Sequence, residues 1–157
     1  MESLHAEHQR VIPPIIAEDI GNANPTALVL ATSCFNAVNM IGMPEARIIL
    51  SQCATYLACS AKSNAAYMAI EAASAEVKKS GDLPVPLHIR NAPTKLMKEI
   101  GYGKDYKYAH SFESNFVELE FLPENISGTK FYEPGNNVRE NEFRTWMKKL
   151  WKEKYGY

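Results

Sequence analysis

Glycine and proline divide the first half of this chain into three segments of helical pattern. Proline in the first turn and glycine just past the last turn are common boundaries of a helix. Asn24-Pro25 opens the first segment and Gly42 ends it, Pro44 opens the second, and Gly81 follows the third. Apolar residues between these boundaries recur at the spacing of one helix face. The pattern predicts helices over about 25–41, 45–59 and 63–79.

The second and third predicted helices are rich in alanine. Small side chains let two helix axes approach closely, which suits an antiparallel hairpin or a contact between subunits. The alanines stand at positions 54, 58, 65, 66, 69, 72, 73 and 75. A further helix is expected from about residue 4 to 17, kinked where Pro13 and Pro14 remove backbone N–H donors.

The pattern changes in the C-terminal third. Apolar residues alternate with glutamates from Phe116 to Phe121, the period of a strand, and the turn-prone residues PENISG follow at 123–128. These features predict a short β-hairpin over about 116–132, then a basic helix from about 138 to 154. The expected fold class is mainly α, a helical domain with a small C-terminal β-hairpin element and a terminal helix.

Two segments are expected to pack as one compact unit. Residues 1–83 form the helical core, and residues 84–157 hold a connector, a short helix, the hairpin and the terminal helix.

With 46% hydrophobic and 22% charged residues, the composition is that of a soluble globular protein. No apolar run approaches the 18 or so residues of a membrane span, so no membrane contact is expected. Cys34, Cys53 and Cys59 form no CxxC pair, and buried, reduced thiols in the cytoplasm are the expectation.

Residues 84–110, PVPLHIRNAPTKLMKEIGYGKDYKYAH, carry more than a helix or strand requires. Five basic residues against two acidic ones give this stretch a net charge of +3, whereas the whole chain carries −1. The prolines at 84 and 86 predict an extended approach. Asn91 is expected to cap a short helix that begins near Pro93, and Gly101 to end it.

Lysines and tyrosines interleave in the second half of the same stretch. Lysines neutralise phosphates and tyrosines stack on unpaired bases, the combination used for single-stranded nucleic acid. The alternative is that the tyrosines fill a loop core while the lysines are merely solvated. The candidate residues for a DNA or partner contact are Arg90, Lys95, Lys98, Tyr102, Lys104, Tyr106 and Lys107.

The stretch resembles the signature of the C-terminal region of the RarA/MgsA family of AAA+ ATPases. Three other segments match in the same order, AEDIGNANPTAL at 17–28, GMPEARIILSQCATYLA at 42–58 and KSNAAYMAIEAA at 62–73. FLPENISGTKFYEP at 121–134 fits the closing segment of the family. The resemblance runs from about residue 10 to about residue 134. It departs from the family at Pro13-Pro14, where relatives usually continue with aliphatic residues.

The resemblance implies a helical oligomerisation domain similar to the collar of clamp loaders, which assembles with itself, typically into a homotetramer. In this family the domain follows a AAA+ module and a helical lid. ATP and Mg²⁺ are expected in that missing N-terminal module, with no catalytic, cofactor-binding or metal-binding residue in this chain. The resemblance associates the intact protein with DNA-stimulated ATP hydrolysis at replication forks, recombination and single-strand-binding protein. It implies a cytoplasmic, nucleoid-associated location.

A phosphate-binding loop is not expected in this chain. GYGK at 101–104 lacks the spacing of a Walker A motif, and Asp105 stands where the motif needs a hydroxyl that ligates Mg²⁺.

Two functions are compatible with the sequence. The preferred one is the non-catalytic oligomerisation domain of a AAA+ ATPase in replication-fork maintenance and recombination, with DNA or partner contacts. The alternative is a free-standing helical module that binds single-stranded nucleic acid.

Overall fold

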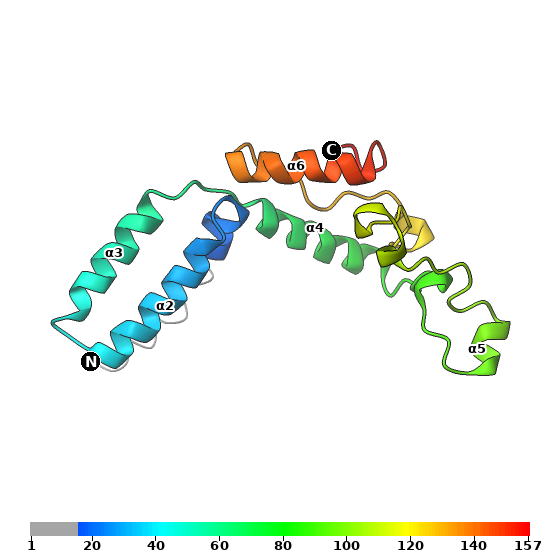
Figure 1. The fold of residues 1–157 in the computed structure, drawn as a ribbon, viewed down its shortest axis with the longest axis horizontal. Helices are drawn as coiled ribbons and strands as arrows, with labels where there is room; N and C mark the ends of the chain where they lie inside the picture. Colours follow the sequence, from blue (N-terminus) through cyan, green and yellow to red (C-terminus); the bar gives the residue numbers. More distant parts are fainter. Residues whose placement is uncertain (1–15) are drawn as a thin grey trace. The chain divides into compact units, whose positions relative to one another are not determined.

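The computed structural model describes residues 16–157, and helices dominate it (Figure 1). After a helical stretch at 16–19, the longer helices are α2 (Thr26–Ile41), α3 (Ala46–Ala58), α4 (Ala65–Ser80), α5 (Lys95–Glu99) and α6 (Val138–Trp151). Short 3₁₀ turns lie at η1 (Gly21–Ala23), η2 (Leu87–Ile89), η3 (Ala109–Ser111), η4 (Glu113–Asn115) and η5 (Glu124–Ile126). The three predicted helices and the terminal helix are confirmed. The helix expected over 4–17 lies outside the described residues except for its last two.

The ends of α2 follow the sequence signals only in part. Gly42 ends the helix as expected, with a φ of 73° and an N–H that donates to the Val38 carbonyl at 2.9 Å. The Asn24 side chain does not cap the helix. Its amide instead donates to the hydroxyls of Tyr56 and Ser60, each at 3.0 Å, and so joins the start of α2 to the end of α3.

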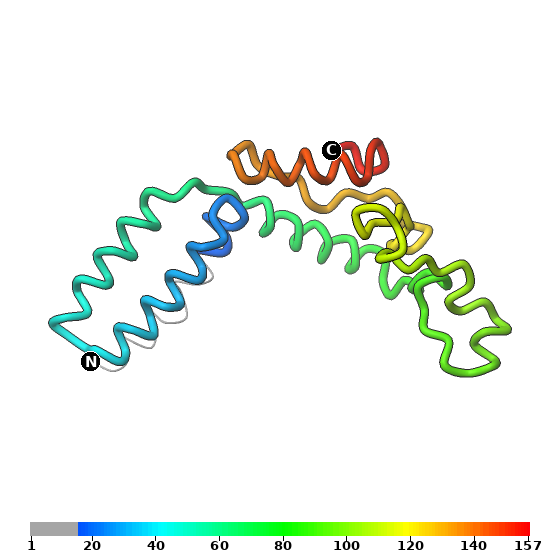
Figure 2. Tube along the Cα trace, viewed as in Figure 1, coloured from blue at the N-terminus to red at the C-terminus, as the bar shows by residue number. Residues whose placement is uncertain are grey.

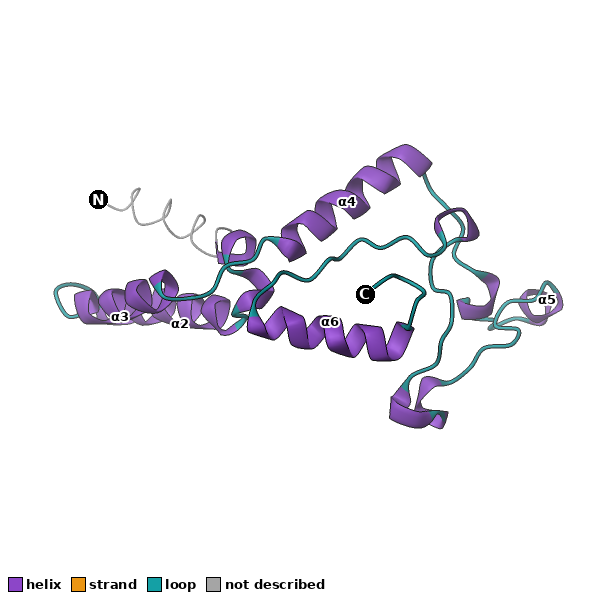
Figure 3. Ribbon diagram, turned by 90° about the horizontal axis from the view of Figure 1, so that it is seen from above, coloured by secondary structure: helices purple, strands orange, loops and turns teal. Residues whose placement is uncertain are grey.

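The predicted β-hairpin is wrong, because residues 16–157 contain no strand (Figure 3). The alternation at 116–121 instead belongs to a single extended segment. Its Phe116 and Phe121 rings meet the Trp151 ring edge-on, with centroids 4.8 and 6.2 Å apart. The turn that follows is closed by the Glu120 carboxylate, which accepts the Leu122 N–H at 2.9 Å. The Glu120 side chain thus bonds a backbone N–H of this segment, where a hairpin would use a paired strand.

The residues divide into two compact units. Within the described chain, the first unit holds residues up to 72 with 131–144, and the second holds 73–130 with 145–157. The boundary falls inside α4 and again inside α6. Each unit therefore combines residues from both of the predicted segments. The expected packing of 1–83 and 84–157 as one compact unit stays a prediction.

The first unit is built on the hairpin of α2 and α3, which lie side by side (Figures 1 and 2). Alanine and cysteine fill much of the seam between them. In the described chain the hairpin expected of the alanine-rich helices at 45–59 and 63–79 is not formed, because α3 packs on α2 and not on α4; a subunit contact of those alanines stays a prediction. The buried residues of this core are Ile16, Ile20, Ala27, Ala31, Cys34 and Cys53, with Leu30, Val38, Ile49 and Leu57 packed partly buried against them. Both helices approach closely because little side-chain volume separates them.

Glu140 is a fully buried polar side chain of the first unit. Its carboxylate accepts hydrogen bonds from the Tyr132 hydroxyl at 2.7 Å and the Asn137 amide at 2.5 Å. Burial alone would raise the pKa of Glu140, but hydrogen bonds from Ser63, Tyr132, Asn137 and the Gly135 N–H lower it. The carboxylate thus stays ionised and joins the loop before α4 to the start of α6.

Glu120 has the equivalent role in the second unit. Its carboxylate accepts the Ser127 hydroxyl at 2.5 Å and pairs with the Lys154 ammonium at 3.4 Å. Burial would raise the pKa of Glu120, but the hydrogen bonds from Ser127 and Leu122 and the charge of Lys154 lower it from 4.5 to about 2. The Glu120 carbonyl also lies 2.8 Å from His88 Nε2, so the network reaches the 84–110 connector.

We expect Glu140→Ala to destabilise the protein by about 3 kcal/mol, because the hydroxyls and the amide around it lose their buried acceptor. Urea denaturation followed by circular dichroism measures the loss. The control is Glu142→Ala, since Glu142 is exposed on the same helix; its effect should stay within about 0.5 kcal/mol. Equal effects of the two variants would contradict the role assigned to Glu140.

Acid should weaken the second unit through Glu120. Because the folded-state pKa is depressed, its contribution is fully present above the ordinary value of 4.5 and is lost as the pH falls toward 2. We expect Glu120→Gln to cost about 2 kcal/mol at pH 7 and progressively less between pH 5 and pH 2. Urea titrations at several pH values measure the difference. Glu118→Gln, which removes only an exposed ion pair with Lys152, is the control; a difference that does not change with pH would contradict the prediction.

Candidate functional site

The 84–110 stretch lies in the second unit and folds back on itself. The η2 turn and the turn at 101–105 are joined by a hydrogen bond, in which the Gly103 N–H donates to the Leu87 carbonyl at 2.9 Å. Gly103 has a φ of 68°, and a Cβ added there would lie 3.3 Å from the Arg90 carbonyl oxygen. Glycine suits this position because the backbone is left-handed and another backbone segment approaches closely.

Arg90 and Tyr102 hold these turns together. The Arg90 Nη1 donates to the Tyr102 hydroxyl at 3.0 Å, and the guanidinium lies 4.9 Å from the centre of the Tyr102 ring. Nε donates to the Val85 carbonyl at 2.6 Å. These two candidate contact residues therefore form the frame of the connector, in which Arg90 Nε, Arg90 Nη1 and the Tyr102 hydroxyl are engaged.

The short helix α5 begins later than predicted. Asn91 does not cap it; the Thr94 hydroxyl accepts the Met97 N–H at 3.3 Å instead. Thr94 has extended backbone angles, which aim its hydroxyl at the first turn, whereas 91–93 are not helical. Gly101 ends the helix as expected, with a φ of 91° and the Tyr102 N–H bonded to the Met97 carbonyl at 2.9 Å.

The backbone N–H groups of GYGK are all engaged within the stretch. The four consecutive N–H groups at 101–104 donate to carbonyls of residues 98, 97, 87 and 101. A phosphate loop instead directs its N–H groups at the ligand. GYGK therefore resembles a phosphate loop in sequence but not in structure.

The remaining candidates lie on the surface. Residues 104–108, named here the exposed turn, are all exposed, and Tyr106 and Tyr108 show 57% and 59% of their surface to solvent. Lys104, Tyr106 and Lys107 are therefore placed close together along one loop. Lys98 is exposed on α5, where Lys95 pairs with Glu99 at 3.8 Å. The loop-core alternative holds for Tyr102 and not for Tyr106 or Tyr108; a contact with DNA stays a prediction.

The sequence did not indicate the contacts that anchor this stretch. His88 meets the Glu120 carbonyl from 32 positions away, and no local pattern connects them. Trp151 lies against Phe116, Phe121 and Tyr155, whose rings approach it edge-on. Trp151 therefore anchors the end of α6 on these rings, whereas Trp146 on the same helix is 50% exposed.

A second candidate surface consists of large apolar side chains. Soluble monomers rarely expose extended apolar patches. Tyr67, Ile70 and Val77 recur at helical spacing along one side of α4, with 40%, 61% and 60% of their surface exposed. On α2 and α3, Val29, Met40, Ile41 and Ile48 are between 54% and 80% exposed. These faces are suited to contact another protein surface.

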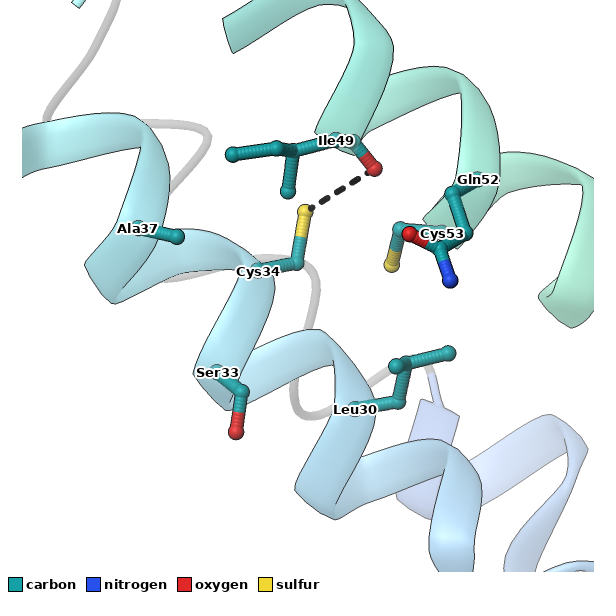
Figure 4. Close-up of a pocket in the computed structure, with 7 residues that line it drawn as sticks. All are labelled: Leu30, Ser33, Cys34, Ala37, Ile49, Gln52 and Cys53. Carbon is teal, nitrogen blue, oxygen red and sulfur yellow. Dashed lines mark hydrogen bonds between the residues drawn. The ribbon is translucent and has the colours of Figure 1, made fainter. Parts of the chain in front are cut away.

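The seam between α2 and α3 contains a small pocket of about 180 Å³ (Figure 4). It is lined by Leu30, Ser33, Cys34, Ala37, Ile49, Gln52 and Cys53. Cys34 and Cys53 are buried as expected, but Cys59 is exposed at the end of α3. Among residues 16–157 no group of three His, Cys, Asp or Glu side chains is placed to hold a metal ion, and no helix could cross a membrane.

The chain is similar to a known family along most of its length. The sequence profile of the MgsA AAA+ ATPase C terminal matches residues 9–151. Replication-associated recombination protein A is 48% identical over 132 residues in Coxiella burnetii and 42% identical over 129 residues in Escherichia coli K12, covering 83% and 82% of this chain. The ATPase WRNIP1 of Dictyostelium discoideum is 46% identical over 118 residues, 74% of this chain.

These matches cover only part of each relative. The aligned regions make up 30%, 29% and 14% of the lengths of the three relatives. The matched region includes the α2–α3 hairpin, α4 and the 84–110 stretch, the segments on which the resemblance was based. The chain therefore belongs to the RarA/MgsA family of AAA+ ATPases, as its C-terminal region.

Proposed function

We propose that this chain is the oligomerisation domain of a AAA+ ATPase that acts in replication-fork maintenance and recombination. The relatives that carry a AAA+ ATPase or recombination name support the parent activity. Nucleotide and Mg²⁺ are bound by a module outside this chain, and the role of the chain is to assemble copies into a homotetramer. The location that follows is cytoplasmic, at the nucleoid, where contact with single-strand-binding protein is expected.

The observation that carries the proposal is the distribution of apolar residues. The buried residues of the α2–α3 seam are mostly alanine and cysteine, whereas Met40, Ile48, Ile70 and other large side chains are more than half exposed. Each large side chain contributes about 1.5–3 kcal/mol when it moves from water into a packed interface. Association of copies through these faces buries apolar surface that one chain leaves in water.

The apolar side of α4, formed by Tyr67, Ile70 and Val77, allows assembly to be tested. We expect the unsubstituted chain, called the parent chain below, to show a mass near four times 17.6 kDa in light scattering at micromolar concentration. Ile70→Glu should shift it toward smaller species and weaken association at least tenfold, because a charge then faces the apolar contact. A parent chain that is strictly monomeric over the whole micromolar range would refute the proposal.

Lys79→Glu is the matched control. It places the same side chain at an exposed position on the opposite side of α4. The control should retain the mass of the parent, and circular dichroism should show equal helix content in all three proteins. Equal loss of assembly in both variants would show that the Ile70 side of α4 is not the contact.

The exposed turn supports a second function, contact with single-stranded nucleic acid. Lys104, Tyr106 and Lys107 are exposed, and no ion pair is found for either lysine within the described chain. Cations beside exposed aromatic rings suit a backbone phosphate next to a stacked base. This contact is compatible with assembly, and by itself it would describe the free-standing binding module.

Fluorescence anisotropy of a labelled single-stranded oligonucleotide at low salt measures this contact. We expect binding that weakens as salt rises, and the double change Lys104→Ala with Lys107→Ala should lower the salt slope by about 1.4, or about 0.7 for each lost phosphate contact. Tyr106→Ala should cost about 1–3 kcal/mol of binding free energy. Lys79→Ala, at an exposed lysine paired with Glu76 on α4, is the control. Unchanged anisotropy of the parent at low salt would refute this function.

A further inference from the structure

The register of the α2–α3 hairpin sets Cys34 opposite Cys53. The chain reverses at residues 42–45, so positions equally far from this turn face each other across the seam. The facing pairs include Val38 with Ile49, Leu30 with Leu57 and Cys34 with Cys53. All six residues belong to one packed core, and Figure 4 shows both cysteine side chains directed into the space between the helices.

Both thiols are reduced and shielded. Cys34 and Cys53 are 7% and 8% exposed, and the Cys34 thiol donates to the Ile49 carbonyl at 3.8 Å, one turn before Cys53 (Figure 4). Burial, together with the adjacent Cys34 thiol, raises the pKa of Cys53 to about 11. Because the thiolate is the reactive form toward peroxide as well as toward other thiol reagents, oxidation of this pair is slow, and burial in addition keeps large reagents away from it.

A small oxidant has a route to the pair. The pocket that both cysteines line has a volume of about 180 Å³, and the exposed residues Ser33 and Gln52 lie at its edge. A water molecule occupies only about 30 Å³ in the liquid. Hydrogen peroxide is little larger than water and is uncharged, so the pocket accommodates it beside the sulfur atoms.

We propose that Cys34 and Cys53 form a reversible disulfide within one chain, linking α2 to α3, when the protein meets hydrogen peroxide. Peroxide transfers an oxygen atom to one thiol, giving a sulfenic acid and one water. The sulfur of the other thiol then attacks the sulfenic sulfur, and hydroxide leaves with the released proton as a second water. Two thiols lose two electrons and two protons in total, while one peroxide becomes two waters.

The proposal does not depend on the proposed function. The bond forms inside one hairpin, so it can form in a monomer or in an assembly. It would fix the register of the two helices and restrict the unfolded chain, which stabilises the hairpin. A dithiol reductant reverses it by exchange.

The test uses the full chain with Cys59→Ser, which removes the exposed thiol. The protein is treated with peroxide, quenched, unfolded in denaturant with N-ethylmaleimide, and weighed by mass spectrometry. We expect the loss of both alkylation sites in a single-chain product two hydrogens lighter than the reduced protein, a cross-linked peptide in a non-reducing digest, and recovery of both sites with dithiothreitol.

Two further variants serve as controls. Cys34→Ser and Cys53→Ser, each with Cys59→Ser, should give no cross-linked product within one chain. The readout on the parent does not require either variant to fold. Two thiols that still react with N-ethylmaleimide after peroxide treatment of the folded parent would overturn the proposal. So would oxygen added to each sulfur without a cross-link, or a disulfide between two chains.

Discussion

The small size of the residues between α2 and α3 determines much of the rest of this structure. Ala27, Ala31 and Cys34 lie against the second helix, so the two helices approach closely and leave little room for larger groups. Large apolar residues of the same helices, such as Met40 and Ile48, are consequently placed on the outside. A hairpin built in this way gains stability from close packing and leaves apolar faces exposed.

The buried apolar core is small, so buried polar contacts contribute a large share of the stability of the fold. Burying a carboxylate is costly unless hydrogen bonds compensate, and both Glu140 and Glu120 receive several. Each also joins segments far apart in the chain, Ser63 with Glu140 in one unit and Lys154 with Glu120 in the other. Apolar packing alone would hold such segments with less directional preference. The two glutamates therefore specify which segments meet as well as stabilise them.

Local signals were sufficient to predict the helices. Gly42 and Gly101 end helices because their positive φ is open to glycine and costly for other residues. Contacts over long sequence distances were not predictable in the same way. The alternation around Glu120 has the period of a strand, but the Glu120 side chain closes a turn and binds Lys154. Asparagine is a common helix cap, yet the Asn24 amide donates to the Tyr56 and Ser60 hydroxyls instead of capping α2.

The candidate site shows the same limit at the level of single residues. Its composition predicted a cationic, aromatic surface, but composition does not separate Arg90 and Tyr102, which hold the loop, from Lys104 and Tyr106, which face solvent. Because the N–H groups at 101–104 are bonded internally, these amides are not available to a phosphate. A phosphate at this turn would depend on flexible lysine side chains. Such contacts are salt-sensitive and carry little sequence information.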